Sequence, residues 1–168
     1  GQFGGPRAIT VDAAGNAVIV DPDWVVPYPG SKPGLVLSPA EAELSSFGNQ
    51  APVSPFTAAE DFNYPVAAAT LLNGNIVVTN QYGYSLKEYS IDAATGALQP
   101  DPKILRSAHE HDKGHAHWTQ WSPEADRLYA VDLGHDEVRS FAYSGGAFTG
   151  GPETAYAMPK KSGPRHLA

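Results

Sequence analysis

The chain has 168 residues, of which 42% are hydrophobic and 17% are charged, and this composition indicates one globular unit rather than a disordered segment. Its formal net charge of −7 argues against a surface for nucleic acid or for an anionic membrane. The absence of cysteine excludes disulfides, thiolate metal ligands and a cysteine nucleophile. No apolar run approaches the ~18 residues of a membrane-spanning helix, and no signal-peptide pattern is present. Because the chain begins at Gly1, we expect processing or truncation upstream.

Two short strands are predicted first, at residues 8–11 and 17–20, where β-favouring residues flank a turn. From about residue 21 to residue 60, seven prolines interrupt any long element. We interpret this stretch as an ordered surface insertion. Within it, residues 35–37 suit a short strand, and residues 38–44 suit a single helical turn opened by Pro39.

A second group of strands follows. Residues 66–71 and 76–79 predict a hairpin around Asn73-Gly74-Asn75, because asparagine and glycine both tolerate a positive φ angle. Residues 85–91 alternate in polarity and predict a third strand, and residues 97–98 suit a brief outer strand.

The histidine-rich stretch 109–133 leads into a third group of strands. If residues 115–121 are extended, side chains alternate in direction, so His115, His117, Thr119 and Trp121 share one face. A turn then leads to a strand at 127–132, a further strand at 138–143 and a weak outer strand after Phe148.

This order of strands recurs three times and predicts an all-β fold, a β-propeller of four-stranded antiparallel blades. Asn75 and Arg127 hold equivalent hairpin positions about 50 residues apart, and Gly5-Pro6-Arg7 recurs as Gly163-Pro164-Arg165 about three such periods later. A β-sandwich with irregular hairpins is the alternative. The predicted blades are 1–60, with the proline-rich insertion at 21–60, then 61–112 and 113–161, with the start of a next blade at 162–168.

Three blades and one strand do not close a ring, since propellers typically have four to eight blades. Each blade needs neighbours to cover its apolar face and its sheet edge. We therefore expect the remainder of the propeller to come from the rest of a longer chain or from another chain.

Three groups of residues carry a family resemblance: His115-Ala116-His117 with Trp121-Ser122-Pro123, the segment 128–134 (LYAVDLG) and the segment 162–168 (SGPRHLA). Together they resemble consecutive blades of the lactonase-type seven-bladed β-propellers. That family includes bacterial 6-phosphogluconolactonases and fungal carboxy-muconate cyclases. The resemblance extends from about residue 64 to residue 168, is weaker before residue 20 and is absent from the proline-rich stretch.

The resemblance implies an active site at the mouth of the central channel, where a histidine, an arginine and a glutamate act together. The first two fall on His117 and Arg165, whereas the glutamate would lie beyond Ala168. An imidazole titrates near neutral pH and suits proton transfer, and a guanidinium suits a carboxylate, a phosphate or a developing oxyanion. His115 is a further candidate, for binding the substrate.

Each candidate also has a structural interpretation. The backbone of a neighbouring blade can satisfy His117 or His115, and Arg165 can pin adjacent blades, as Arg7 in the matching first-blade segment suggests. Other residues nearby are interpreted as structural: Trp118 and Trp121 as inter-blade packing, Asp132 as a turn cap, and Lys160 and Lys161 as a solvated pair.

Imidazole and carboxylate side chains near residue 110 raise the question of a metal site. However, His109-Glu110-His111-Asp112 matches no closed ligand motif, even with His115 and His117 added. The resemblance also implies enzymes that need no metal for catalysis. We therefore predict neither a metal site nor a cofactor.

The sequence thus favours an enzyme that hydrolyses a sugar lactone such as 6-phosphogluconolactone, or that forms or opens a muconate-type lactone. Its expected partner is a small anionic lactone or a dicarboxylate, with neither nucleic acid nor a membrane span. The alternative is a non-catalytic propeller that serves as a binding or surface protein, since a fold does not fix a function.

Overall fold

The computed structural model describes residues 5–21, 34–40, 42–47, 65–81, 85–92, 95–99, 103–106 and 114–168. These residues form thirteen β-strands and no helix, and therefore no helix that is long and apolar enough to cross a membrane. The strands form three antiparallel sheets, each built from one continuous stretch of the chain. The all-β class predicted from the sequence is confirmed.

The first two sheets have four strands each, in sequence order. The first contains β1 (Ala8–Val11), β2 (Ala17–Val20), β3 (Gly34–Leu37) and β4 (Glu43–Phe47), and the second contains β5 (Pro65–Thr70), β6 (Ile76–Asn80), β7 (Ser85–Tyr89) and β8 (Lys103–Arg106). The third contains β9 (Ala116–Trp121), β10 (Arg127–Asp132), β11 (Glu137–Ser144) and β13 (Glu153–Ala157), and the short β12 (Ala147–Phe148) extends β11 as a hairpin.

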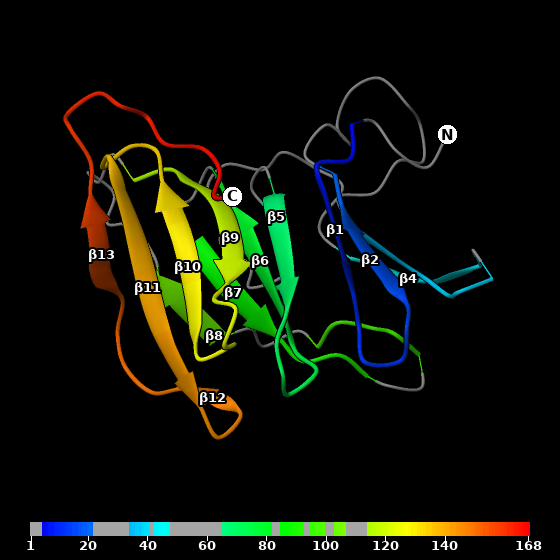
Figure 1. The fold of residues 1–168 in the computed structure, drawn as a ribbon. Helices are drawn as coiled ribbons and strands as arrows, with labels where there is room; N and C mark the ends of the chain where they lie inside the picture. Colours follow the sequence, from blue (N-terminus) through cyan, green and yellow to red (C-terminus); the bar gives the residue numbers. More distant parts are fainter. Residues whose placement is uncertain are drawn as a thin grey trace.

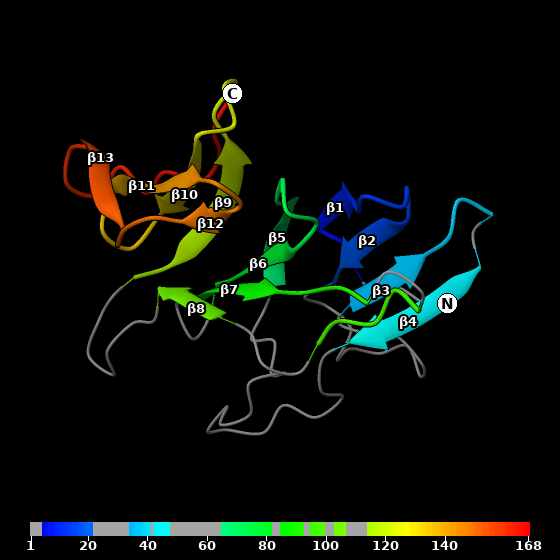
Figure 2. The same ribbon diagram turned by 90° about the horizontal axis from the view of Figure 1, so that it is seen from below.

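The three sheets stand side by side as propeller blades do. Figure 2 shows them fanning out from one edge, along which β1, β5 and β9 lie in succession, and β5 contacts both of its neighbours. Each of these strands is the first of its sheet, so the sheets are related by a repeated rotation about the edge that the first strands form. This arrangement is that of blades around a central channel.

The middle sheet buries apolar residues on both faces, and β6 shows how. Its residues alternate between two core clusters: Val77 packs toward the third sheet, whereas Ile76 and Val78 pack toward the first sheet. Strand side chains point alternately to opposite faces, so the run IVV serves both interfaces at once. Leu128 on the third sheet is fully buried in this interface. Its truncation to alanine should lower the free energy of unfolding by about 2–5 kcal/mol.

The three inner hairpins repeat the same turn. In each turn an amide donates to the carbonyl three residues earlier: Gly15 to Asp12 at 3.0 Å, Gly74 to Leu71 at 2.9 Å and Ala125 to Ser122 at 2.9 Å. All three donor residues have a positive φ angle, 84°, 85° and 55° in that order. Glycine adopts this conformation without strain, and only the third hairpin places alanine there. The hairpin repeat seen in the sequence is therefore a repeat of backbone geometry.

Part of the proline-rich stretch belongs to the first sheet. Within it, β3 and β4 complete the first sheet, and the helical turn expected at residues 38–44 is wrong. Instead, residues 39–40 form a turn, and the Ser38 amide donates to the Ala42 carbonyl at 2.9 Å, directly before β4. Proline suits a turn as well as the first turn of a helix, so Pro39 does not distinguish between the two. Residues 22–33 and 48–64 lie outside the described residues.

Two further segments also differ from expectation. The brief strand expected at residues 97–98 is an isolated bridge between Ile91 and Leu98, and the outer strand of the second sheet is β8 instead. Residues 162–168, expected to open a next blade, contain no strand, and no described strand pairs with them. The blade boundaries therefore stay a prediction.

Candidate active site

A cavity of about 310 Å³ opens where the innermost strands begin. Arg7 precedes β1, Val66 lies at the start of β5, and His117 lies at the start of β9. Gln81 and Leu133 follow the ends of β6 and β10, which run antiparallel to the inner strands and so finish at the same level. Trp118, Arg165 and His166 complete the described lining. His117 and Arg165, 48 residues apart in sequence, thus lie at one cavity.

A β-bulge sets the direction of His117. Val131 pairs with Trp118 but Asp132 pairs with Ala116, so His117 is an extra residue in β9. The bulge reverses the alternation of side chains at this point of β9. As a result, Ala116 lies in the core cluster against which Trp121 packs, on the same face of the strand as Trp121. The expectation that His115, His117, Thr119 and Trp121 share one face is therefore wrong for the start of the strand. The local irregularity lets His117 and Trp118 both line the cavity.

His117 is held by a hydrogen bond to the backbone of the terminal segment. Its Nδ1 lies 3.0 Å from the carbonyl oxygen of Arg165. A carbonyl only accepts, so Nδ1 carries the proton of this bond, and in the neutral ring Nε2 keeps its lone pair. The bond therefore selects one tautomer and leaves Nε2 as a base.

The pKa of His117 is lowered, first because partial burial disfavours the charged imidazolium. The Arg165 carbonyl opposes this by raising the pKa, whereas the charges of His166 and of the Arg165 guanidinium lower it further. A pKa below the ordinary 6.5 keeps the imidazole neutral at pH 7. His117 is thus ready to accept a proton.

A second imidazole, that of His166, and two guanidiniums also lie at the cavity. The His166 ring meets His117 edge-on at 5.3 Å between ring centroids and Trp118 at 5.0 Å. Arg165 is exposed, and within the described part of the chain no carboxylate lies within ion-pair distance of it. With Arg7 on the same cavity, the described lining contains two guanidiniums and no carboxylate, in a chain of net charge −7.

Two other predicted residues lie elsewhere. His115 is not among the described residues that line the cavity; its amide donates to Asp132 Oδ1 at 2.9 Å and its carbonyl accepts from the Leu133 amide at 2.9 Å. Its role in substrate binding stays a prediction. Trp121 ties two blades together, because its indole N–H donates to the Thr70 carbonyl at 2.8 Å. Trp118, interpreted as inter-blade packing, also lines the cavity.

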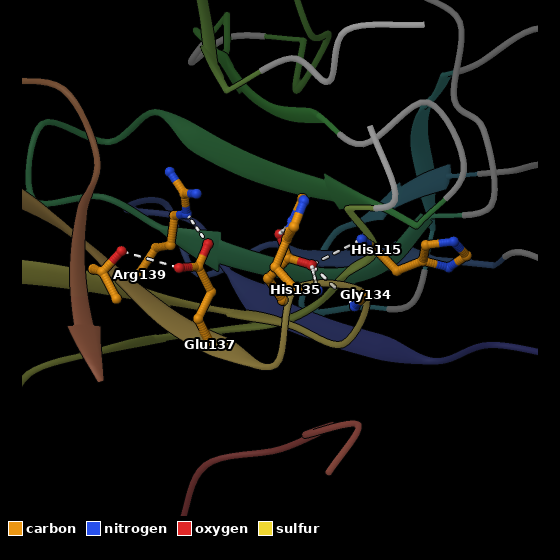
Figure 3. Close-up of polar contacts among 7 residues, drawn as sticks. His115, Gly134, His135, Glu137 and Arg139 are labelled. Atoms are coloured by element: carbon orange, nitrogen blue, oxygen red, sulfur yellow. Dashed lines mark hydrogen bonds and ion pairs between the residues drawn. The ribbon is translucent and has the colours of Figure 1, made fainter. Parts of the chain in front are cut away.

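A cluster of possible metal ligands lies beside the start of β9. Oxygen or nitrogen atoms of Asp132, His135 and Glu137 lie within 4.8 Å of one another. Figure 3 shows that these groups already have protein partners: the His115, Gly134 and His135 amides donate to one Asp132 oxygen, and Arg139 donates to Glu137. His135 Nδ1 lies 2.9 Å from the second Asp132 oxygen, and Thr154 donates to the second Glu137 oxygen at 2.9 Å.

This cluster fits a structural network better than a cation site, because an arginine and three amide dipoles already neutralise its two carboxylates. It also bears out the interpretation of Asp132 as a turn cap. The histidine and acidic run 109–112 considered for a metal lies outside the described residues.

Sequence reasoning missed several lining residues. Arg7 had a signal, since its Gly-Pro-Arg triplet repeats that of Arg165, but the repeat was taken as a sign of a structural role. His166 follows Arg165 directly and could have been named with it. Val66, Gln81 and Leu133 carry no pattern of their own, because only the alignment of three blades brings them to one level.

Comparison with known proteins places the chain among propellers. The family model described as lactonase, 7-bladed β-propeller, matches residues 44–168. A protein from Bacteroides uniformis, named provisionally as a 6-phosphogluconolactonase, is 19% identical with a TM-score of 0.65, and the match covers 97% of this chain and 46% of that one. The periplasmic gluconolactonase of Pseudomonas aeruginosa is 18% identical with a TM-score of 0.61, covering 96% and 47%.

Proteins with other descriptions share the fold. An auxiliary nutrient binding protein from Bacteroides ovatus is 15% identical with a TM-score of 0.61, and the match covers 94% of this chain and 33% of that one. No curated protein sequence matches. The chain spans between a third and a half of the length of these solved structures. At such identities the structural matches show the fold alone, and the assignment to a family rests on the family model.

Proposed function

The chain belongs to the lactonase family of seven-bladed β-propellers, and on that premise we propose that it supplies part of the active site of an enzyme that hydrolyses a small anionic lactone. The observation that carries the proposal is the contact of His117 with the Arg165 segment at a cavity lined by two guanidiniums. A neutral histidine with a free Nε2, beside a cation, is the combination that lactone opening needs.

The reaction follows from these two groups. His117 Nε2 takes a proton from a water molecule as the water oxygen attacks the lactone carbonyl. Arg165 stabilises the oxyanion of the tetrahedral intermediate through its N–H donors. When the ring C–O bond breaks, the leaving alkoxide takes the proton from the His117 imidazolium, and the hydroxy acid forms. His117 thus ends the cycle neutral, as it began.

The lining also bears on the substrate. An acidic protein that gathers Arg7 and Arg165 at one cavity favours a ligand with a negative charge there. A volume of about 310 Å³ lies at the lower end of the range for small-molecule sites and suits a monosaccharide-sized lactone. A phosphorylated sugar lactone such as 6-phosphogluconolactone meets both conditions.

A muconate-type reaction uses the same residues differently. There His117 would transfer a proton at carbon while Arg165 binds a carboxylate, and the ring would close or open without water. The two reactions are distinguished by their products. Ring opening of a muconolactone to the muconate with no hydrolysis of a sugar lactone would replace the present proposal by this one.

The experiment compares two lactones on the complete protein. Hydrolysis of 6-phosphogluconolactone and of glucono-δ-lactone is followed by proton release at constant pH, after subtraction of the spontaneous rate. We expect saturable hydrolysis with a clear preference for the phosphorylated lactone. Binding of 6-phosphogluconate without hydrolysis of either lactone would contradict the proposal and favour the non-catalytic binding propeller.

A further inference from the structure

The segment that carries Arg165 is anchored by one side chain, Asp136. Figure 1 shows the last residues of the chain passing from β13 across the ends of β11 and β10 to reach β9. In its course, the Lys161 amide donates to Asp136 Oδ2 at 2.6 Å and the Gly163 amide to Oδ1 at 2.8 Å. The Ser162 hydroxyl lies 3.3 Å from Oδ1, and the Met158 amide donates to the Asp136 carbonyl at 2.7 Å.

The backbone around these contacts is held in an unfavourable conformation. Asp136 and Lys161 have positive φ angles of 54° and 68°, which residues with a Cβ atom rarely adopt, and Gly163 has 55°. Such angles persist where surrounding contacts determine them. Here the contacts are the hydrogen bonds of one carboxylate to two backbone amides and a hydroxyl. Asp136 therefore selects the path of the segment rather than merely touching it.

The same turn also fixes the start of β9. Asp136 lies in the turn between β10 and β11, and Asp132, the last residue of β10 before that turn, accepts from the His115 amide at 2.9 Å. One short turn thus holds both partners of the hydrogen bond between His117 and the Arg165 carbonyl, one through each aspartate. The separation of the two partners depends on this turn.

We propose that Asp136 is a positioning residue: by holding residues 161–163 it places the Arg165 carbonyl on His117 Nδ1 and so fixes the tautomer and orientation of the imidazole. Asp136 does not line the cavity and touches no reacting atom. Its effect on catalysis rests on the proposed lactone hydrolysis, whereas its effect on His117 does not. The three donors lower the pKa of the Asp136 carboxyl, the two amides most, so this anchor remains charged at neutral pH.

Kinetics of two variants test the catalytic part in the complete protein. Asp136→Gly removes the carboxylate and tolerates the positive φ, and we expect kcat to fall about tenfold with a smaller change in KM, because a misplaced base slows the chemical step. Asp136→Asn keeps one acceptor and accepts the same φ, so we expect an intermediate loss. The control is Asp126→Ala, which removes a carboxylate bound by Ser122 at the other end of the sheet. Equal kcat values in Asp136→Gly and the control would overturn the proposal.

Nuclear magnetic resonance of the histidine rings tests the structural part without turnover. The His117 signals are assigned by their loss in His117→Gln, and their nitrogen shifts report the tautomer and the pKa. We expect the Nδ1–H form in the wild type, and in Asp136→Gly a mixture of tautomers with a pKa closer to 6.5, since the imidazole becomes more solvated. Asp136→Asn should show the same change at smaller amplitude. An unchanged tautomer and pKa in both variants would overturn the positioning role, whereas an inactive wild type would overturn only the proposed hydrolysis.

Discussion

Two segments with the same Gly-Pro-Arg triplet line the candidate site, yet they are held in different ways. In the first, the Arg7 amide donates to the Val20 carbonyl at 3.0 Å and the chain continues directly into β1. In the second, Arg165 is in no strand, and its carbonyl accepts from His117. The repeat therefore puts two arginines at one level of the propeller, and the neighbouring strand decides what each can do. The Arg165 carbonyl meets a histidine that lies on a bulge.

The largest difference is expected from removing the Arg165 guanidinium. Arg165→Gln should lower kcat for the lactone about 10²–10³-fold, because an oxyanion donor acts mainly in the transition state. Steady-state kinetics of the complete protein measure this. Lys160→Gln is the matched control, since it removes a neighbouring exposed charge that does not line the cavity. Arginine variants that lose no more activity than this control would give Arg165 the structural role considered for it.

Arg7 is expected to act on binding instead. Arg7→Gln should raise KM for 6-phosphogluconolactone about tenfold and leave kcat nearly unchanged, because Arg7 lines the cavity and we assign it to binding the charged group of the substrate rather than the reacting carbonyl. KM for the uncharged glucono-δ-lactone should not change. A loss of kcat for both lactones would show that the two arginines share one role, and the comparison between them would fail.

The pH dependence distinguishes the titration of His117 from that of Asp136, which holds the segment of Arg165. A general base must be neutral, and burial lowers the pKa of His117, so kcat/KM should hold below pH 6.5 and then fall as His117 becomes protonated. The pKa of Asp136 is lowered from 3.8, so its contribution to stability is complete above pH 3.8 and is lost as the pH falls through the lower folded value. Rate profiles and acid unfolding curves measure the two steps. An acid limb above pH 6.5 would contradict the proposed state of His117.

The glycine of the terminal triplet gives the smallest expected effect. Gly163 has a φ of 55°, whereas Gly150, in the connection between β12 and β13, has no positive φ. No atom lies within 4 Å of a Cβ placed at either glycine, so only the backbone of Gly163 opposes a side chain. Gly163→Ala should therefore cost about 1 kcal/mol of stability at the terminal segment, and the control Gly150→Ala less. Thermal unfolding of the two variants measures the difference in stability. Equal melting temperatures would contradict this expectation.

The sequence was sufficient for those parts of the structure that depend on local order. The hairpin at Asn73-Gly74 and the β-favouring residues at 127–132 predicted β5, β6 and β10, and the repeat of these units predicted the propeller. The strands β4 and β8 escaped because prolines border them and their register is set by the preceding strand. Outer strands of a blade have few apolar residues to mark them.

For the site, the residue types were informative but their arrangement was not. His117 and Arg165 were named from motifs, and the structure brings them to one cavity. The bulge that turns His117, by contrast, has no sequence signature, because it arises from pairing with Val131 and Asp132. The placement of Arg7 beside Arg165 also depends on how blades pack, since the two lie at opposite ends of the chain. Groupings of this kind depend on how the three sheets pack.

The central claim is that His117, held by the Arg165 carbonyl, is the base of a lactone hydrolase. The most direct test is the rate of 6-phosphogluconolactone hydrolysis at pH 7 by the complete protein and by its His117→Gln variant, with folding checked by circular dichroism. We expect kcat/KM to fall by about 10²–10⁴-fold in the folded variant. Hydrolysis at the wild-type rate by folded His117→Gln would contradict it.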